Sequence, residues 1–322
     1  MTIEHLAVLG QILAAIENDT LALPALPDVA LRLQKLIDDP NVAADEIVAA
    51  LSGDALISAQ LIKSANGAAF ADKHPVNNVR GALSRLGYRQ VRNLVIATTM
   101  SKMFRFGNPL LNRHLESVWE HSRRVAAVSY VLGARKPYLS PDQAMLGGLV
   151  SRIGTLPLCT FIETRQLSLN EEELQVLLDK YSAMVGGKLL GKWSFPEELI
   201  NVATPRSETQ AAGDNLSRAD YADVAAVSDL LLKENAADIA WDSLAAVQRL
   251  GLSDEGCIEF MEHNAARIAE VSEMLGLTAA GSSSSPPAAE SRSPFSASGT
   301  VAPRPAGKLD ALLAWLKALL KR

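Results

Sequence analysis

The side chains best suited to hold a metal ion or to act as a nucleophile are spread through the sequence without a recognisable site. No two histidines lie three or four positions apart, the spacing that places two metal ligands on one face of a helix. The histidines are His5, His74, His114, His121 and His263. The chain also lacks a P-loop, a dinucleotide-binding glycine pattern and a G-x-S-x-G nucleophile elbow. These patterns predict no catalytic residue, no metal ligand and no cofactor, and a Ser-His-Asp arrangement would need geometry that spacing cannot supply.

The two cysteines, Cys159 and Cys257, lie in apolar helical patterns with no histidine or cysteine at metal-ligand spacing. This placement predicts two core thiols in a reducing compartment. The first residues lack the basic region and continuous apolar run of a signal peptide. No stretch of the sequence is expected to serve as a transmembrane helix. The expected location is therefore the cytoplasm.

A group of arginines raises the possibility of nucleic-acid binding. Arg80, Arg85, Arg89 and Arg92 surround Tyr88, and three of them are spaced to share a helix face. Phosphate binding usually needs a broader basic surface, and the chain outside its last 44 residues carries a formal charge of -9. Nucleic acid is therefore an unlikely partner, unless these arginines line one exposed face instead of pairing with carboxylates.

Apolar residues recur at intervals of three and four along most of the chain, and strand-like alternation is nearly absent, which predicts an all-α fold. Helix starts are marked by Asp28 after Pro27, by Asp54, by Asn108 before Pro109 and by Ser140 before Pro141. The expected helices cover residues 28–38, 43–51, 55–65, 79–103 with a possible break at Gly87, 109–132, 141–153, 171–190, 196–203, 215–234, 240–248 and 254–276. Residues 204–214 are expected to form an exposed loop.

The last part of the chain differs in composition. Residues 277–307 are rich in Ser, Pro, Ala and Gly, which predicts a flexible, disordered linker. Residues 308–322 are then predicted to form a short basic amphipathic helix, which can bind a partner groove, a membrane surface or its own body, or have no function. The residues expected to make the contact are Leu312, Leu313, Trp315, Leu316, Lys317 and Leu320. Residues 279–322 carry six basic and two acidic side chains, a charge of +4.

Five short strings stand out in the first part of the chain: Leu23 to Pro27, Asp54 to Leu56, Ala65 to Gly67, Ala82 to Gly87 and Val91 to Leu94. In their order and spacing, these strings resemble the HDOD family, an HD-related output domain. The match continues through Trp119 to Ser122, Gly147 to Gly154, Gly186 to Trp193, Phe195 to Pro196 and Val227 to Asp229. Structural motif roles are assigned to Pro24, Leu26, Pro27, Asp54, Asn66, Leu86, Gly87, Gly148, Gly154, Trp193 and Pro196.

The resemblance implies a multi-helix HDOD-like bundle over residues 1–276. It divides this bundle into an N-terminal lobe of about residues 1–106 and a lobe related to HD phosphohydrolases of about residues 107–276. Read singly, the motif residues have plain structural roles. The prolines suit a rigid entry turn, Asp54 suits a helix N-cap, and Asn66 and Gly87 suit helix ends or close packing.

The resemblance also implies where a metal centre would be. HD phosphohydrolases hold divalent metals with a His, an adjacent His-Asp pair and a later Asp. His121 matches the first of these ligands and Asp229 the last, but Ser151 and Arg152 stand where the His-Asp pair belongs. Serine is a poor ligand for these ions, and arginine brings a permanent positive charge. Metal binding is therefore expected to be strongly disfavoured.

Two arrangements of these vestigial positions remain open. Arg152 can pair with Asp229 or with Glu120 and so fill the old site with an internal ion pair. Alternatively, Arg152 and His121 can form an anion pocket for a phosphorylated ligand. By itself, His121 is more often a hydrogen-bonded helix histidine than a metal ligand.

These observations predict a non-catalytic bacterial signal-transduction or scaffold module that binds a protein partner or a regulatory ligand. It would lie in the cytoplasm or at a membrane surface reached through residues 308–322. One alternative is a metal-dependent phosphohydrolase of nucleotides or cyclic dinucleotides with a rearranged site, favoured if His121, Asp229 and a third donor converge. The other alternative is a nucleic-acid-binding regulator.

Overall fold

The computed structural model describes residues 20–39, 41–67, 70, 74–205 and 218–277, with a few positions between 11 and 18. The chain divides into two units, Met1–Leu277 and Thr278–Arg322. The predicted linker and amphipathic helix, with Leu312, Leu313, Trp315, Leu316, Lys317 and Leu320, lie beyond residue 277 and outside the described residues. Within the described part, helices are the only regular elements, which confirms the all-α class.

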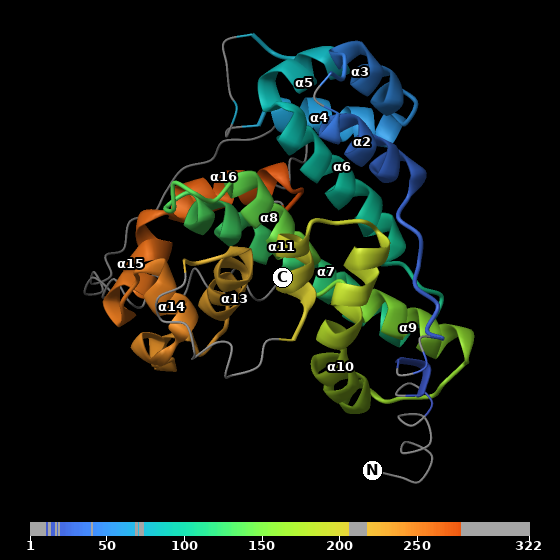
Figure 1. Cartoon of the computed structure of the whole chain (residues 1–322), viewed down its shortest axis with the longest axis vertical. Coiled ribbons are helices and arrows are strands. Elements are labelled where there is room, and N and C mark those ends of the chain that lie inside the picture. Colours follow the sequence, from blue (N-terminus) through green and yellow to red (C-terminus); the bar gives the residue numbers. More distant parts are fainter. Residues whose placement is uncertain are drawn as a thin grey trace, which may run out of the picture. The chain divides into compact units, whose positions relative to one another are not determined.

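Five helices form an N-terminal cluster, at the top of Figure 1. They are α2 (Asp28–Asp38), α3 (Ala44–Ser52), α4 (Ala55–Ala65), α5 (Val79–Leu86) and α6 (Tyr88–Met103). The break between α5 and α6 is at Gly87, whose φ of 79° lies in the left-handed region where a side chain would be strained. Gly87 therefore lets one predicted apolar stretch fold as two helices that change direction.

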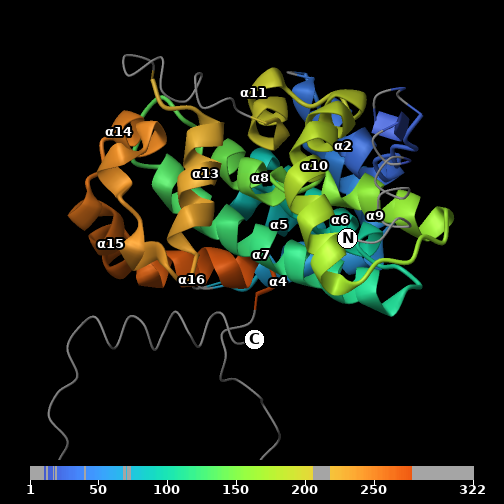
Figure 2. The ribbon, with the colours of Figure 1, turned by 90° about the horizontal axis from the view of Figure 1, so that it is seen from below.

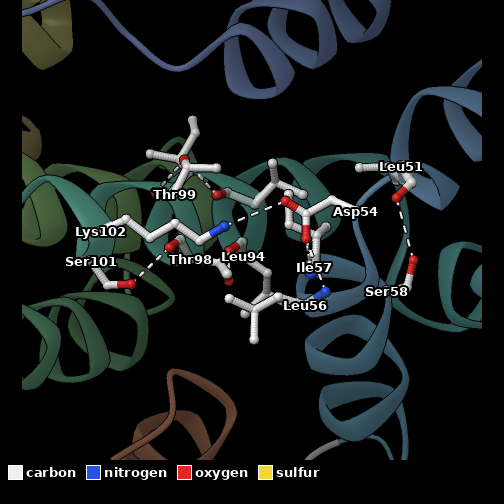
Figure 3. Close-up of polar contacts among 12 residues, drawn as sticks. Leu51, Asp54, Leu56, Ile57, Ser58, Leu94, Thr98, Thr99, Ser101 and Lys102 are labelled. Carbon is white, nitrogen blue, oxygen red and sulfur yellow. Dashed lines mark hydrogen bonds and ion pairs between the residues drawn. The ribbon is translucent and has the colours of Figure 1, made fainter.

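Asp54 begins α4 as predicted from its position. Its Oδ1 accepts hydrogen bonds from the backbone N–H groups of Leu56 at 2.9 Å and Ile57 at 3.1 Å, two of the groups that a helix start leaves unpaired (Figure 3). Its other oxygen faces the Lys102 ammonium of α6 at 3.4 Å. Because the bond from Ile57 favours the carboxylate, the pKa of Asp54 is lowered. The cap thus also links α4 to α6.

A long hairpin forms the centre of the fold. Helices α7 (Pro109–Gly133) and α8 (Pro141–Val150) pack along each other, and the side chain of Asn108 caps α7 ahead of Pro109 as predicted. Gly148 sets their separation, because a Cβ atom at that position would lie 2.5 Å from the Ala126 Cα atom and 2.7 Å from its nitrogen. Contacts this short involve backbone and cannot be relieved by rotating a side chain.

The remaining helices surround this hairpin in Figures 1 and 2. They are α9 (Thr155–Thr164), α10 (Glu171–Lys192), α11 (Glu197–Ile200), η2 (Asn201–Ala203), α13 (Tyr221–Leu231), η3 (Ala236–Asp238), η4 (Trp241–Ser243), α14 (Ala245–Leu250), α15 (Asp254–His263) and α16 (Ala265–Met274). Helix α13 packs on both α7 and α8, and α16 packs on α7 and α4.

Several predicted helices differ from the structure. The helix expected at 141–153 ends at Val150, and α9 was not predicted. The stretch expected at 254–276 divides at Asn264, whose side chain donates to the Phe260 carbonyl at 2.8 Å and ends α15. The stretch expected at 240–248 is a short 3₁₀ turn followed by α14, and α13 begins at Tyr221, later than expected. Most of the loop expected at 204–214 lies outside the described residues.

One stretch is long and apolar enough to cross a membrane, contrary to the sequence-based expectation. It runs from Pro141 to Thr164, but 78% of its most apolar window is buried inside the protein. It is also interrupted between Val150 and Thr155, where α8 ends and α9 begins. This degree of burial is that of a core segment of the protein.

Cys159 of α9 and Cys257 of α15 are buried as predicted, and burial raises the pKa of the Cys159 thiol to about 12.

Candidate functional site

The vestigial positions meet where three helices pack together. His121 lies on α7, Ser151 caps the end of α8, Arg152 follows in the turn before α9, and Asp229 lies near the end of α13. Because α13 packs on both α7 and α8, the fold brings Asp229 to residues more than 70 positions earlier in the chain.

A single carboxylate oxygen joins this group. Oδ1 of Asp229 lies 2.6 Å from Nε2 of His121 and accepts a hydrogen bond from Nη2 of Arg152 at 2.9 Å. All three side chains are partly buried, with exposed fractions of 27% for His121, 36% for Arg152 and 22% for Asp229. Of the two partners considered for Arg152, the structure thus places it on Asp229.

The electrostatics of Asp229 reflect these two contacts. Burial by itself would raise the pKa of its carboxyl, because it disfavours the charged form. The hydrogen bond from His121 and the charge of Arg152 outweigh burial and lower the pKa to about 2. Asp229 is therefore a carboxylate at all physiological pH values, and its charge is balanced within the protein.

Ser151 and Glu120 do not join the group. The Ser151 hydroxyl donates to the Gly148 carbonyl at 2.9 Å, which turns it to its own helix end and provides no Ser-His-Asp arrangement with His121. Glu120 pairs with Arg124, one turn further along α7, at 2.5 Å. The second partner considered for Arg152 is therefore already engaged.

The donor set does not fit a divalent metal. His121 and Asp229 are the remaining ligand types, and the guanidinium of Arg152 lies against the same Asp229 oxygen that a cation would need. Within the described ranges, no group of three or more His, Cys, Asp and Glu side chains is arranged to hold a metal ion. A third donor, the feature that would favour a rearranged hydrolase site, is thus not found in this part of the chain.

His114 is a neighbour of the site that the sequence reasoning missed. It lies seven positions before His121, a spacing that places both on one side of α7. Burial lowers its pKa, Asp179 and Glu171 act in the opposite direction, and Arg152 is close enough to add to the lowering. Its Nε2 is buried without a hydrogen-bond partner among the described residues. A search for histidines seven positions apart could have found this relation.

The motif residues assigned structural roles are distributed through the fold. Trp193 donates from Nε1 to the Pro24 carbonyl at 2.8 Å, and this bond joins two motifs that lie 169 positions apart. The Asn66 amide exchanges hydrogen bonds with the backbone of Val76 at 2.7 and 2.8 Å. A Cβ atom on Gly154 would overlap the Ser182 carbonyl of α10. Pro27 and Pro196 precede α2 and α11, and the side chains of Leu26 and Leu86 are buried.

The arginine group does not form one exposed basic face. Arg80 pairs with Asp45, and Arg85 donates to the carbonyls of Ala65 at 3.2 Å and His74 at 2.6 Å. Arg92 is only 8% exposed. The feature that would have strengthened the nucleic-acid alternative is therefore not present in these residues.

Solved structures with the same fold come from several bacteria. A protein of Shewanella amazonensis SB2B titled "Putative metal-dependent phosphohydrolase" matches with a TM-score of 0.66 and 24% identity, over 85% of this chain and all of that one. An HDOD domain protein of unknown function from Geobacter sulfurreducens matches with a TM-score of 0.57 and 19% identity, over 84% and 97%. A "Putative signal transduction protein" from Marinobacter aquaeolei VT8 matches with a TM-score of 0.57 and 22% identity, over 85% of this chain and 66% of that one.

Sequence comparison gives the family. A relative from Treponema pallidum (strain Nichols), named as an uncharacterized protein, is 24% identical over 194 residues, which is 56% of this chain and 36% of that relative. The family model of the HDOD domain matches residues 23–208. This match covers more than half of the sequence and includes the Pro24 and Trp193 motifs that the Trp193 hydrogen bond joins. The chain belongs to the HDOD domain family.

Proposed function

We propose that this protein is a non-catalytic signal-transduction or scaffold module of a bacterial cell, which acts by binding a protein partner or a regulatory ligand. One observation carries the proposal. The oxygen of Asp229 that would bind a metal in an HD hydrolase instead accepts a hydrogen bond from Arg152 and contacts His121. Displacing Arg152 would leave a charge without a partner in a partly buried site, which is unfavourable.

The same contact argues against the anion pocket as the main role of this site. An incoming phosphate group would compete with Asp229 for Arg152, and the fixed carboxylate would repel it. The phosphohydrolase alternative requires a third donor, and the described residues offer none with His121 and Asp229. Metal-dependent hydrolysis is the second candidate, because similar structures from Shewanella amazonensis SB2B are named as putative phosphohydrolases.

The test is the divalent-metal content of the purified, untagged protein after incubation with manganese, iron or magnesium. The matched control is the double variant His121→Ala/Asp229→Ala, checked for folding by its melting temperature. We expect no retained metal in either protein. Stoichiometric metal in the wild type that is lost in the variant would overturn the proposal and direct attention to phosphodiester substrates.

The proposal includes a role for residues 308–322 as a second contact, with a partner protein or a membrane surface, in a protein located in the cytoplasm. The leucine face and basic residues of this segment support the idea. Flotation with anionic lipid vesicles, comparing the full chain with a chain ending at residue 307, distinguishes the two surfaces. Flotation of the full chain alone supports membrane attachment, whereas no flotation of either favours a protein partner.

A further inference from the structure

A cavity of about 130 Å³ lies away from the vestigial site, where α2 and α6 meet α8 and the turn between α10 and α11. Gln34, Arg92 and Gln143 supply polar groups to its lining, and Ile96 and Phe195 supply apolar surface. A cavity of roughly 150 Å³ can hold benzene, so this one approaches the size needed for a single six-membered ring. Neither His121, Arg152 nor Asp229 lines it.

Gln34 presents an unused acceptor at this cavity. Its side chain amide donates from Nε2 to the Ser194 carbonyl at 3.0 Å, which fixes which end of the amide is the oxygen. Gln34 is only 9% exposed, and its Oε1 is buried without a hydrogen-bond partner in the described part of the chain. The Oε1 atom of Gln143 is likewise buried without a hydrogen-bond partner among the described residues. Buried acceptors are normally hydrogen-bonded, so we expect these two oxygens to accept hydrogen bonds from a molecule outside the protein chain.

The backbone at the cavity wall is held in an unusual conformation. Ser194 has a φ of 57°, in the left-handed region that non-glycine residues rarely adopt. The turn is fixed at the end of α10, because Ser194 donates to the Gly191 carbonyl at 2.9 Å and Phe195 to the Leu190 carbonyl at 3.0 Å. The Ser194 carbonyl that holds Gln34 is thus fixed in position before any ligand binds.

The charges around the cavity favour a neutral occupant. Arg92 is buried, but it acts electrostatically on the neighbouring Asp142 carboxylate together with Arg89. Its positive charge is therefore already balanced in part, which disfavours an additional anion. The acceptors at the cavity are amides instead of carboxylates, which disfavours a cation.

We propose that this cavity binds a small uncharged cyclic amide, the chemical class of the pyrimidine bases. The ring N–H donates to Gln34 Oε1, a ring carbonyl accepts from the Arg92 guanidinium, and the ring faces rest on Ile96 and Phe195. Ordered water can pair with the same two glutamine oxygens, so a bound ring has to displace it and replace its hydrogen bonds. The inference is independent of whether the Arg152 site is catalytic.

The experiment is calorimetric titration of the full chain with uracil as the probe and with 1,3-dimethyluracil as the matched control ligand. The control keeps the ring and both carbonyls but has no N–H. We expect saturable binding of uracil and, because the Gln34 oxygen would then lack its donor, a dissociation constant at least about tenfold higher for the control. Equal binding of both ligands, or no saturable binding of uracil up to its solubility limit, would overturn the proposal.

Variants of lining residues test whether uracil binds at this cavity. Gln34→Met removes the acceptor at similar size, and Ile96→Phe fills the cavity while leaving Gln34 in place. Gln60→Met is the control, because the Gln60 amide also donates to a backbone carbonyl, that of Met274 at 3.3 Å, away from the cavity. We expect Gln34→Met to weaken uracil binding by about tenfold and Ile96→Phe to abolish it. Gln60→Met should leave it unchanged. Undiminished binding by a folded Ile96→Phe variant would place the uracil elsewhere and reject the site.

Discussion

Arg152 donates a hydrogen bond to Asp229 over 2.9 Å, although the two residues lie 77 positions apart in the chain. The contact occupies the carboxylate that the family resemblance matches to a metal ligand of HD hydrolases, and it does so with a group that cannot lose its charge at physiological pH.

Restoring the ligand pair should restore metal binding. In the double variant Ser151→His/Arg152→Asp, the guanidinium is gone and the ligand types of the hydrolase pattern stand beside His121 and Asp229. We expect the variant to retain manganese or iron at about one ion or more per chain, measured by elemental analysis after gel filtration. The same variant carrying Asp229→Ala should retain none. A folded double variant without metal would mean that the surrounding helices, and not these two residues alone, prevent binding.

The stability of the protein should fall in acid because of Asp229. Its pKa is about 2 in the folded protein and 3.8 ordinarily, so its stabilising contribution is complete above about pH 4 and disappears as the pH falls toward 2. The difference corresponds to on the order of 2 kcal/mol of unfolding free energy. We expect Asp229→Asn to lose less stability than the wild type between pH 6 and pH 3, measured by urea unfolding. Parallel pH curves for the two proteins would contradict this assignment.

Gly148→Ala should be destabilising, since the added methyl group would meet the Ala126 backbone at 2.5 Å and force α7 and α8 apart. We expect a loss of about 1–3 kcal/mol in the unfolding free energy, the usual range for overpacking. Gly53→Ala is the control, because a Cβ atom there has no neighbour within 4 Å and the φ of Gly53 is -73°. It should change stability by less than about 1 kcal/mol. Equal effects at both glycines would show that the hairpin tolerates a wider separation.

Asp54 should stabilise α4 mainly as a cap and only weakly through its ion pair. We expect Asp54→Ala to lower the unfolding free energy by about 1 kcal/mol. Asp54→Asn keeps an acceptor for the N–H groups of Leu56 and Ile57 and should lower it by less. Lys102→Met should have a smaller effect than Asp54→Ala, because Lys102 is half exposed and such pairs contribute little. Chemical denaturation of the three variants checks the order. A larger loss for Lys102→Met than for Asp54→Ala would reverse it.

Sequence signals that depend on neighbouring residues predicted helix starts and breaks. The Asp54 cap, the break at Gly87 and the start of α7 at Asn108 each depend on one or two neighbouring residues, and each was placed correctly. The pairing of Arg152 with Asp229 was one of the two ion pairs considered from the family pattern and charge complementarity, and the sequence alone did not decide between Asp229 and Glu120.

Features that depend on distant packing were missed. Apolar spacing continues across Asn264, so periodicity alone could not reveal that its side chain ends α15. The buried pair of Asp223 and Arg249, only 1% and 5% exposed, joins two helices whose contact no motif indicated. The Gln34 cavity is formed by segments up to 165 positions apart, from Gln34 to Leu199, and a single glutamine on an amphipathic helix gives no sign of it.

The Arg152–Asp229 pair also affects how substitutions at positions 151 and 152 combine. Arg152→Asp alone would place a second carboxylate beside Asp229 without a cation to balance it, and Ser151→His alone would leave the guanidinium where a metal would bind. Without a bound metal, the first substitution is expected to cost stability, although it supplies a third donor type beside His121 and Asp229. The effect of a substitution at one of these two positions is therefore expected to depend on the residue at the other, so that the double variant cannot be judged from the two single variants.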